Sequence, residues 1–387
     1  MNNQHGLHTS LAFFNVDNQP LEVNNKYHEE RVEYDSLGNA VVYSYYTYDG
    51  KRALREGLYH KIINEYDQMN RLVKAEYYGV SDSLTSIDNG VCVIRWYYGQ
   101  SGELEKVSFF DEHDKPHCCK EGNASKKYEY DISNGNLKTI EYHDQNDRLA
   151  RMSDGIARQE FDYDKETNKV SRQRDYDMMG NLVGMTLFEY DRRGNVTKMS
   201  ELSASGALKP GTVVLNAEYD TNNKIIKVWY TNLKKEGVPA PGTSTYSLTR
   251  KYDAVGNLIE EAYLGMGGGL VVQTDNMGLS YARKLSKYND YGNEKEVKYY
   301  DSSNRHFRTD TYAYNDRNRA VEHVILNGKG KEDDSFTGFS RQTIIYDKEG
   351  LVVQRMDFFD SRKQKLGYRV YDETTKEWGD FVVSSKE

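Results

Sequence analysis

Short runs in which apolar and polar residues alternate recur along the chain and predict β-strands. Tyr128 and Tyr130, like Ile344 and Tyr346, are separated by one polar or β-branched residue, so each pair lies on one face of an extended strand. These runs are separated by clusters of Asp, Asn, Gly and Ser, which are typical of turns. The pattern predicts a chain of many short strands.

A Tyr followed by Asp or a close substitute recurs among these strands at nearly regular spacing. The first four of these tyrosines are each 32 residues apart, and the mean period over all twelve is 30.6 residues. A period of this length indicates a tandem array of one supersecondary unit. The tyrosines are Tyr34, Tyr66, Tyr98, Tyr130, Tyr163, Tyr190, Tyr219, Tyr252, Tyr288, Tyr314, Tyr346 and Tyr371.

The residues after each tyrosine have the chemistry of a hairpin turn. Asp is favoured at the first position of a type I turn, and Gly three residues later adopts the left-handed conformation that lets the strands pair again. Where Gly is absent the residue is Asn, which tolerates that conformation best after Gly. The turn residues predicted in this way are Asp35, Gly38, Asp191, Gly194, Asp253, Gly256, Gly292, Asp347 and Gly350, with Asn70, Asn168, Asn223 and Asn318 in place of Gly.

A second aromatic pair follows each turn by about one strand, as in Tyr77-Tyr78 and Phe109-Phe110, and a further polar turn follows the pair. Each repeat therefore contains two strands, and the array is an antiparallel meander. We expect equivalent tyrosines on successive hairpins to stack into ladders across the sheet. The glycine stretch 265–269 lacks the Gly-Lys-Ser/Thr motif of a phosphate site, and we interpret it as an enlarged second turn.

The predicted fold class is all-β: tandem antiparallel β-hairpin repeats that form an extended, twisted or spiralling single sheet, either open and solenoid-like or shell-like. Residues 1–33 are expected to form a partial repeat or N-terminal cap. Residues 34–370 are expected to form about eleven hairpin repeats, and residues 371–387 a C-terminal cap.

The composition agrees with a small hydrophobic core and a large solvent-exposed surface. Hydrophobic residues make up 37% of the chain and the mean hydropathy is −0.86, yet 33 Tyr and only 5 Pro separate it from disordered sequences. The 60 acidic and 52 basic residues are spread along the whole chain, which argues against a nucleic-acid partner. No apolar run approaches the roughly 18 residues of a membrane span.

The first ten residues lack the charged and apolar regions of a signal peptide, so we expect none in this chain. The three cysteines, Cys92, Cys118 and Cys119, cannot form a disulfide framework. These features leave the compartment open, and a cell-surface or secreted location fits if the chain belongs to a larger protein.

The Tyr-Asp-x-x-Gly-Asn signature resembles that of the YD-repeat (Rhs-like) proteins, and the resemblance covers Tyr34 to Asp360. The longer period here is similar to that of the YD-x-x-G-N repeats of some large bacterial proteins. The resemblance implies β-repeat architecture. In Rhs proteins the repeats form a hollow shell around a toxin, but none of the five prolines here follows an Asp, as the self-cleaving core motif of that family requires.

The segment 111–119 contains the only cluster with metal-ligand chemistry, His113, His117, Cys118 and Cys119. It occupies the second turn of a repeat, and no separated second pair of ligands is evident. We therefore interpret it as an irregular polar loop and expect neither a metal nor another cofactor. The recurring Asp residues are explained by turn geometry, since a catalytic carboxylate pair occurs once and not in every repeat.

Aromatic residues in excess of what one packed face needs are the best candidates for binding: Trp96, Trp229, Tyr230, Tyr45 and Tyr46. The leading hypothesis is a non-enzymatic β-repeat scaffold or protein-interaction module of a larger bacterial protein. The alternatives are a carbohydrate-binding surface that uses Tyr and Trp platforms, with a polysaccharide as partner, and the wall of an Rhs-like toxin-encapsulating shell.

Overall fold

A computed structural model describes residues 2, 6–14, 20–22, 27–347, 353–372 and 377–384. These residues contain strands β1 to β28 and one 3₁₀ turn, Met266–Gly268, so the all-β prediction is confirmed. Over the same ranges no helix is long and apolar enough to cross a membrane. The chain divides into two compact units, Met1–Thr186 with Ser203–Gly206 and Leu187–Leu202 with Ala207–Glu387.

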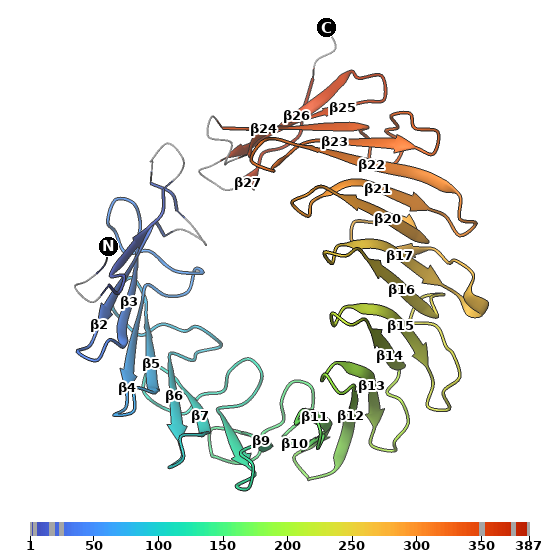
Figure 1. Ribbon diagram of the computed structural model, residues 1–387. Helices are drawn as coiled ribbons and strands as arrows, with labels where there is room; N and C mark the ends of the chain where they lie inside the picture. Colours follow the sequence, from blue (N-terminus) through green and yellow to red (C-terminus); the bar gives the residue numbers. More distant parts are fainter. Residues whose placement is uncertain are drawn as a thin grey trace. The chain divides into compact units, whose positions relative to one another are not determined.

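The first unit is a run of antiparallel hairpins in chain order (Figure 1). Each hairpin also pairs with the next one, which makes a meander. Its strands are β1 (Ser10–Ala12), β2 (Glu29–Tyr34), β3 (Ala40–Tyr46), β4 (Lys61–Tyr66), β5 (Leu72–Tyr78), β6 (Val93–Tyr98), β7 (Leu104–Phe110), β8 (Ser125–Tyr130), β9 (Leu137–His143), β10 (Arg158–Tyr163) and β11 (Val170–Tyr176); β12 (Leu182–Tyr190) begins in this unit.

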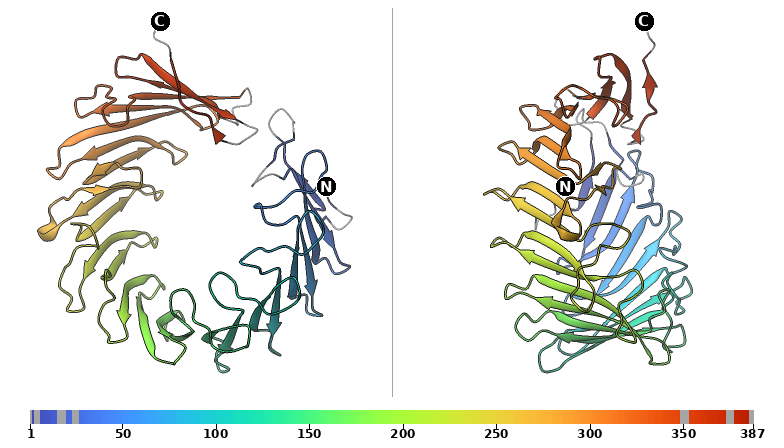
Figure 2. Two further views of the ribbon diagram at one scale, coloured as in Figure 1. Left: turned by 180° about the vertical axis from the view of Figure 1, so that it is seen from behind. Right: turned by 90° about the vertical axis from the view of Figure 1, so that its right-hand side faces the viewer.

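The second unit continues the same antiparallel order, which the two further views of Figure 2 also show. A separate two-stranded sheet, β18 with β19, lies in one connection. The strands are β13 (Val196–Ser203), β14 (Val214–Tyr219), β15 (Ile225–Thr231), β16 (Ser247–Tyr252), β17 (Leu258–Leu264), β18 (Gln273–Thr274), β19 (Ser280–Tyr281), β20 (Arg283–Tyr288), β21 (Glu294–Tyr300), β22 (His306–Tyr314), β23 (Ala320–Asn327), β24 (Arg341–Tyr346), β25 (Val353–Phe359), β26 (Lys365–Asp372), β27 (Glu377–Trp378) and β28 (Val382–Val383).

The two faces of the first unit's sheet have different chemistry. On one face, Ser44 pairs across the strands with Arg31 and Lys61, and ion pairs such as Arg95 with Asp114 at 2.7 Å cover the surface. On the other face the cross-strand partners are aromatic or aliphatic, as in Ile62 opposite Tyr43 and Tyr77. The long connections between hairpins cover this aromatic face, because Tyr59 from such a connection packs on Tyr77 with ring centres 5.2 Å apart.

Aromatic ladders form on the covered face, but with a different composition from the predicted one. The rings of Tyr27 and Tyr45 are 4.9 Å apart, and those of Tyr45 and Tyr59 are 6.0 Å apart. The equivalent residues Tyr45 and Tyr77 are therefore separated by Tyr59, which the hairpin pattern alone does not place between them. The second unit repeats this arrangement, in which Tyr281 lies between Tyr263 and Tyr299.

Repeat length depends on how one hairpin joins the next. In long repeats a second turn is followed by a third, for example Ile87 to Val91, before the chain enters the next hairpin. Where the spacing between signature tyrosines is shorter, as from Tyr288 to Tyr314, the turn 301–305 joins β21 directly to β22. The third turn has turn residues of its own, as in Asp88-Asn89-Gly90, but the spacing of the signature tyrosines did not reveal it.

The glycine stretch 265–269 is not an enlarged turn. The N–H of Gly265 donates to the carbonyl of Gly269 at 2.7 Å, and that of Gly268 donates to Gly265 at 3.1 Å, as in the other five-residue second turns. The additional length of this repeat lies further along the chain, where β18 and β19 flank the third turn. The expectation of an enlarged second turn was therefore wrong.

A buried ion cluster lies in the second unit between β22 and β23. Arg308 and Asp310 are 6% and 3% exposed, and two guanidinium N–H groups donate to the carboxylate at 2.6 and 2.7 Å. His323 Nε2 lies 3.3 Å from the same carboxylate, and the His323 ring stacks on Tyr312. Burial alone raises the pKa of Asp310, but the neighbouring His323 and Arg308 hold it below its usual value.

Candidate interaction grooves at the hairpin turns

Where the signature residue is Asp, its side chain closes the hairpin turn. Asp35 Oδ1 accepts the backbone N–H groups of Leu37 at 2.9 Å and Asn39 at 2.8 Å, and Gly38 adopts a φ of +88°. Asp253 accepts the N–H groups of Val255 and Asn257 in the same way. An Asx turn followed by a left-handed residue satisfies the backbone and reverses the chain without help from other repeats.

The other predicted turn residues have matching conformations. Gly194, Gly256 and Gly292 have φ values of +79°, +95° and +83°. The Asn residues in place of Gly are also left-handed, with φ between +54° and +61° at Asn70, Asn168, Asn223 and Asn318. Asp191 accepts the N–H groups of Arg193 and Asn195. Asp347 is described, whereas Gly350 lies outside the described residues.

Acidic pH is expected to loosen these turns together. The side-chain amide of Asn39, followed by backbone N–H groups, lowers the pKa of Asp35 from its ordinary value of about 3.9. A lowered folded-state pKa means that the turn contributes stability above the unfolded value and loses it as the pH falls through the folded value. The same direction holds at Asp67, Asp111, Asp144, Asp164, Asp177, Asp191, Asp253 and Asp301.

Thermal unfolding followed by circular dichroism between pH 7 and pH 3 measures this effect. We expect a nearly constant midpoint down to about pH 5 and a steep fall below pH 4, because many carboxylates become protonated over the same range. A midpoint that stays level from pH 5 to pH 3 would show that the turn carboxylates contribute little.

In nine of the described repeats the signature tyrosine links its hairpin to the one before it. Tyr252 Oη donates to the backbone carbonyl of Ile225 at 3.0 Å, and Ile225 is the first residue of β15, just after the preceding turn. We call this bond the tyrosine clamp. Its length is 2.6–3.1 Å in Tyr66–Ala40, Tyr98–Leu72, Tyr130–Leu104, Tyr163–Leu137, Tyr219–Val196, Tyr252–Ile225, Tyr288–Leu258, Tyr314–Glu294 and Tyr346–Ala320.

The clamp lies beyond the end of the backbone strand pairing between neighbouring hairpins. Within a hairpin β14 and β15 form six cross-strand pairs, but β15 and the next hairpin form only three, the outermost being Lys227 with Thr249. Beyond this pair the hairpins diverge towards their turns, so the carbonyl of Ile225 has no strand partner on that side. The tyrosine hydroxyl satisfies this carbonyl and fixes the separation of the turns.

Replacing Tyr252 with phenylalanine tests the clamp at one position. Loss of the hydroxyl leaves the carbonyl of Ile225 without its donor, and we expect a loss of about 0.5–1.5 kcal/mol in the free energy of unfolding, measured in urea. Tyr291→Phe is the matched control, since that side chain is 77% exposed. Equal effects of the two substitutions would contradict a specific role for the clamped hydroxyl.

Side-chain amides add a second link between neighbouring turns. Asn39 Nδ2 donates to Asn70 Oδ1 at 3.0 Å, and Asn289 Nδ2 donates to Asn318 Oδ1 at 2.9 Å. Asn70 and Asn318 thus supply the left-handed turn position in their own repeat and a hydrogen-bond acceptor for the preceding repeat. The turns of neighbouring repeats are consequently held in a row.

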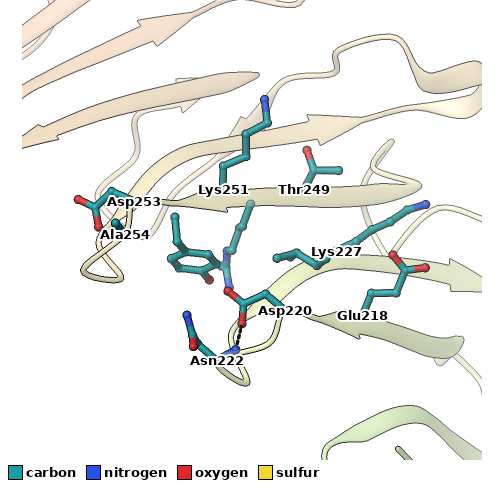
Figure 3. Close-up of a pocket in the computed structure, with 11 residues that line it drawn as sticks. Glu218, Asp220, Asn222, Lys227, Thr249, Lys251, Asp253 and Ala254 are labelled. Atoms are coloured by element: carbon teal, nitrogen blue, oxygen red, sulfur yellow. Dashed lines mark hydrogen bonds between the residues drawn. The ribbon is translucent and has the colours of Figure 1, made fainter.

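The diverging hairpins leave a groove of about 640 Å³ between β14–β15 and β16–β17. The turn with Asp220 and Asn222 and the turn with Asp253 lie at the same end of the groove, on opposite sides of it, as Figure 3 shows. The clamped Tyr252 lies in its wall, so the clamp that links the hairpins also shapes the groove.

An equivalent groove of about 780 Å³ follows in the next repeat, between β16–β17 and β20–β21. Ile259, Lys287 and Tyr288 occupy the positions that Ile226, Lys251 and Tyr252 have in the first groove. Grooves at the same place in consecutive repeats are suited to an extended partner that contacts several repeats.

The charges in these grooves are largely neutralised by neighbours. Lys251 Nζ pairs with Glu260 at 2.8 Å, and Lys287 Nζ pairs with Glu296 at 2.9 Å. The carboxylate of Asp253 accepts hydrogen bonds from the backbone N–H and the side-chain amide of Asn257 in its own turn. The grooves can therefore offer hydrogen bonds and ring surfaces, and they present no concentrated charge of either sign.

The residues of the polar segment 111–119 have separate local partners. His113 lies in an exposed turn, His117 Nε2 is 2.8 Å from the carbonyl of Asn89, and the buried Cys119 donates to Asn123 at 3.4 Å. Cys118 is half-buried. Across the ranges that the structure describes, no three His, Cys, Asp or Glu side chains are grouped in a way that could hold a metal ion.

The aromatic binding candidates lie in different environments. Tyr45 has no exposed surface, so it belongs to the core and offers no ring face to a ligand. Trp96, Tyr46, Trp229 and Tyr230 are half-buried. Trp229 and Tyr230 are consecutive residues of β15 and so point to opposite faces of the sheet.

Sequence reasoning did not find the groove residues Lys251, Lys287 and Tyr291. They lie next to or inside the signature turns, which the pattern explains by turn geometry alone. A signal was available at the third turn position, where the exposed residue is apolar or aromatic in four repeats: Leu37, Met69, Val255 and Tyr291.

No protein-family model matches the chain, and no curated protein does. Solved structures do match. One is the Photorhabdus luminescens Tc holotoxin pore, at 12% identity and a TM-score of 0.41 over 96% of this chain and 21% of the other. A TcdB2–TccC3–TEV crystal structure matches at 11% identity and 0.41, over 99% and 22%.

A porin-like protein from Bacteroides uniformis matches at 9% identity and a TM-score of 0.20, over 76% of this chain and 86% of the other. The chain spans about a fifth of the length of the toxin chains it matches. At these identities and TM-scores no activity or partner carries over to this chain, and membership of the YD-x-x-G-N group stays a prediction.

Proposed function

We propose that this chain is a non-enzymatic β-repeat scaffold of a larger bacterial protein and that the row of turn grooves is its interaction surface. The observation that carries the proposal is the recurrence of one groove in consecutive repeats, each with a clamped tyrosine in its wall. A fixed backbone with variable side chains at the turns is a general design for binding, because the scaffold positions the contacts in advance.

The use of the polar side chains supports a role without catalysis. The signature Asp residues accept backbone N–H groups, and the groove lysines Lys251 and Lys287 are paired with glutamates. A general base or nucleophile needs a free group within reach of its substrate, and these groups are already engaged.

Site-specific photocrosslinking in the native host tests the proposal. A benzophenone amino acid at Ala254 or at Asp290 lies in a groove, whereas one at Gln145 lies in an exposed second turn outside both grooves. We expect crosslinked species from the two groove positions and none from Gln145. Equal crosslinking from all three positions, or from Gln145 alone, would count against the grooves as the interaction surface.

The wall of an Rhs-like shell is the second candidate. In the first unit one face carries ion pairs and the other is covered by the connections, so neither face leaves a bare apolar sheet. A wall with solvent or cargo on both sides requires faces of this kind. A cargo protein fused genetically to the chain can be treated with added protease and compared with the same cargo supplied as a separate chain. Protection of the fused cargo alone would favour this candidate over the scaffold.

A further inference from the structure

The groove between the turns that begin at Asp253 and Asn289, here called the Tyr291 groove, has an exposed aromatic wall. Tyr291 occupies the third position of its turn and is 77% exposed. Its backbone is fixed, because the N–H of Tyr291 donates to Asn289 Oδ1 at 3.0 Å and Gly292 has a φ of +83°. The ring is thus a free surface on a rigid support, which lowers the entropic cost of stacking a ligand on it.

The polar groups of the Tyr291 groove are suited to a neutral ligand with many hydroxyl groups. Lys287 is neutralised by Glu296, and Asp253 is occupied by its turn. Asp290 and the Tyr291 hydroxyl have no hydrogen-bond partner among the described residues, so both are available to a ligand. An anionic ligand would find no unpaired cation here, because Lys287 is paired with Glu296.

An extended peptide fits this groove less well. Peptides commonly bind a sheet by adding a strand at a free edge, but β17 is paired with both β16 and β20, and β20 with both β17 and β21. Peptide side chains would otherwise need enclosed apolar pockets as anchors, and the aliphatic residues here, Val255 and Ile259, lie in an open groove.

We propose that the Tyr291 groove binds a neutral linear polysaccharide, with the Tyr291 ring against a sugar face and Asp290 accepting hydrogen bonds from sugar hydroxyls. The inference rests on the proposed function of the grooves and names its ligand class. One repeat advances the sheet by two strands, about 10 Å, which is close to the length of a disaccharide unit. A chain of several sugars would therefore reach the neighbouring groove, in which Tyr252 and Lys251 correspond to Tyr288 and Lys287, while Val255 stands at the position of Tyr291.

Affinity electrophoresis of the full chain through gels that contain neutral glucans, xylans or mannans tests this proposal. We expect retardation by at least one of these polymers. Tyr291→Ala should weaken the apparent affinity about 10-fold or more, in line with the loss of a central aromatic contact. Tyr97→Ala is the matched control, since Tyr97 is 43% exposed on a strand and lines neither groove, and it should leave the retardation unchanged.

Oligosaccharides of increasing length refine the test, because affinity should rise until the ligand spans both grooves. Absence of retardation by every polymer, or equal retardation of the wild type and Tyr291→Ala, overturns the polysaccharide proposal. Peptides that are selected from a random library and lose binding in Tyr291→Ala would also overturn it, while they would support the groove as an interaction surface. Failure of the ligand class is thus distinguished from failure of the proposed function.

Discussion

Replacing Asp310 with alanine is expected to lower the free energy of unfolding by about 3–5 kcal/mol. Asp310 is 3% exposed and accepts two hydrogen bonds from Arg308, which is itself 6% exposed. Removal of the carboxylate leaves a buried guanidinium without its counter-charge, and water cannot reach it to compensate. Urea unfolding followed by circular dichroism measures the loss.

Two further variants make this result specific. Glu189→Ala breaks the ion pair with Lys198, whose side chains are 64% and 33% exposed, and should cost less than about 1 kcal/mol. The double substitution of Arg308 by methionine and Asp310 by leucine removes both charges and should recover most of the lost stability. A double variant that is as unstable as Asp310→Ala would show that lost packing, and not the unpaired charge, causes the effect.

Tyr45→Ala is expected to cost a similar amount, about 3–5 kcal/mol, in the first unit. Tyr45 has no exposed surface, its ring contacts Tyr27 and Tyr59, and its hydroxyl accepts a hydrogen bond from Arg55 at 2.6 Å. Its removal opens a cavity in the aromatic ladder that joins hairpin to connection. Differential scanning calorimetry should show a lowered midpoint for the transition to which this unit contributes.

Tyr48→Ala is the control for this substitution. Tyr48 lies three residues further along the chain and is 65% exposed, so its truncation should change stability by no more than about 0.5 kcal/mol. Tyr45→Phe distinguishes the contribution of the ring from that of the hydroxyl. It keeps the ring contacts but removes the hydrogen-bond acceptor of Arg55, and we expect it to lower the free energy of unfolding by about 1–3 kcal/mol. A small effect of Tyr45→Ala would mean that the ladder does not stabilise this unit.

The turns were predictable from sequence because their chemistry is local. Asp35 and Gly38 act within five consecutive residues, so spacing alone reveals the turn and the conformation of its glycine. The alternation of residues likewise placed the strands. In contrast, the clamp joins Tyr252 to Ile225 in the preceding repeat, and no local pattern reveals an acceptor in another hairpin.

Burial was harder to predict than secondary structure. Tyr45 and Tyr46 are neighbours of the same type, yet Tyr45 is fully buried and Tyr46 half-buried, because the connection with Tyr59 covers only one face of the sheet. The groove at Tyr291 forms because two hairpins diverge beyond the last backbone pair between β17 and β20. Both features depend on contacts between segments that the sequence pattern does not relate.

The signature tyrosine has a different role from the one that its aromatic character suggests. Tyr252 and its equivalents each hydrogen-bond a carbonyl of the preceding hairpin, whereas the ladders are built from other tyrosines, such as Tyr45, Tyr59 and Tyr77. The repeated signature thus combines a self-contained turn with a bond to the previous turn. This combination explains why one short motif can build an array without a deep core.

Hydrogen exchange measured by mass spectrometry tests this account most directly. In a variant with phenylalanine at Tyr219, Tyr252 and Tyr288, we predict faster amide exchange in β14–β17, β20 and β21, by about 2- to 10-fold for each lost bond of 0.5–1.5 kcal/mol. The first unit, whose clamps are intact, should exchange as in the wild type. Unchanged exchange in these strands, or equal acceleration throughout both units, would contradict the tyrosine clamp as the link between repeats.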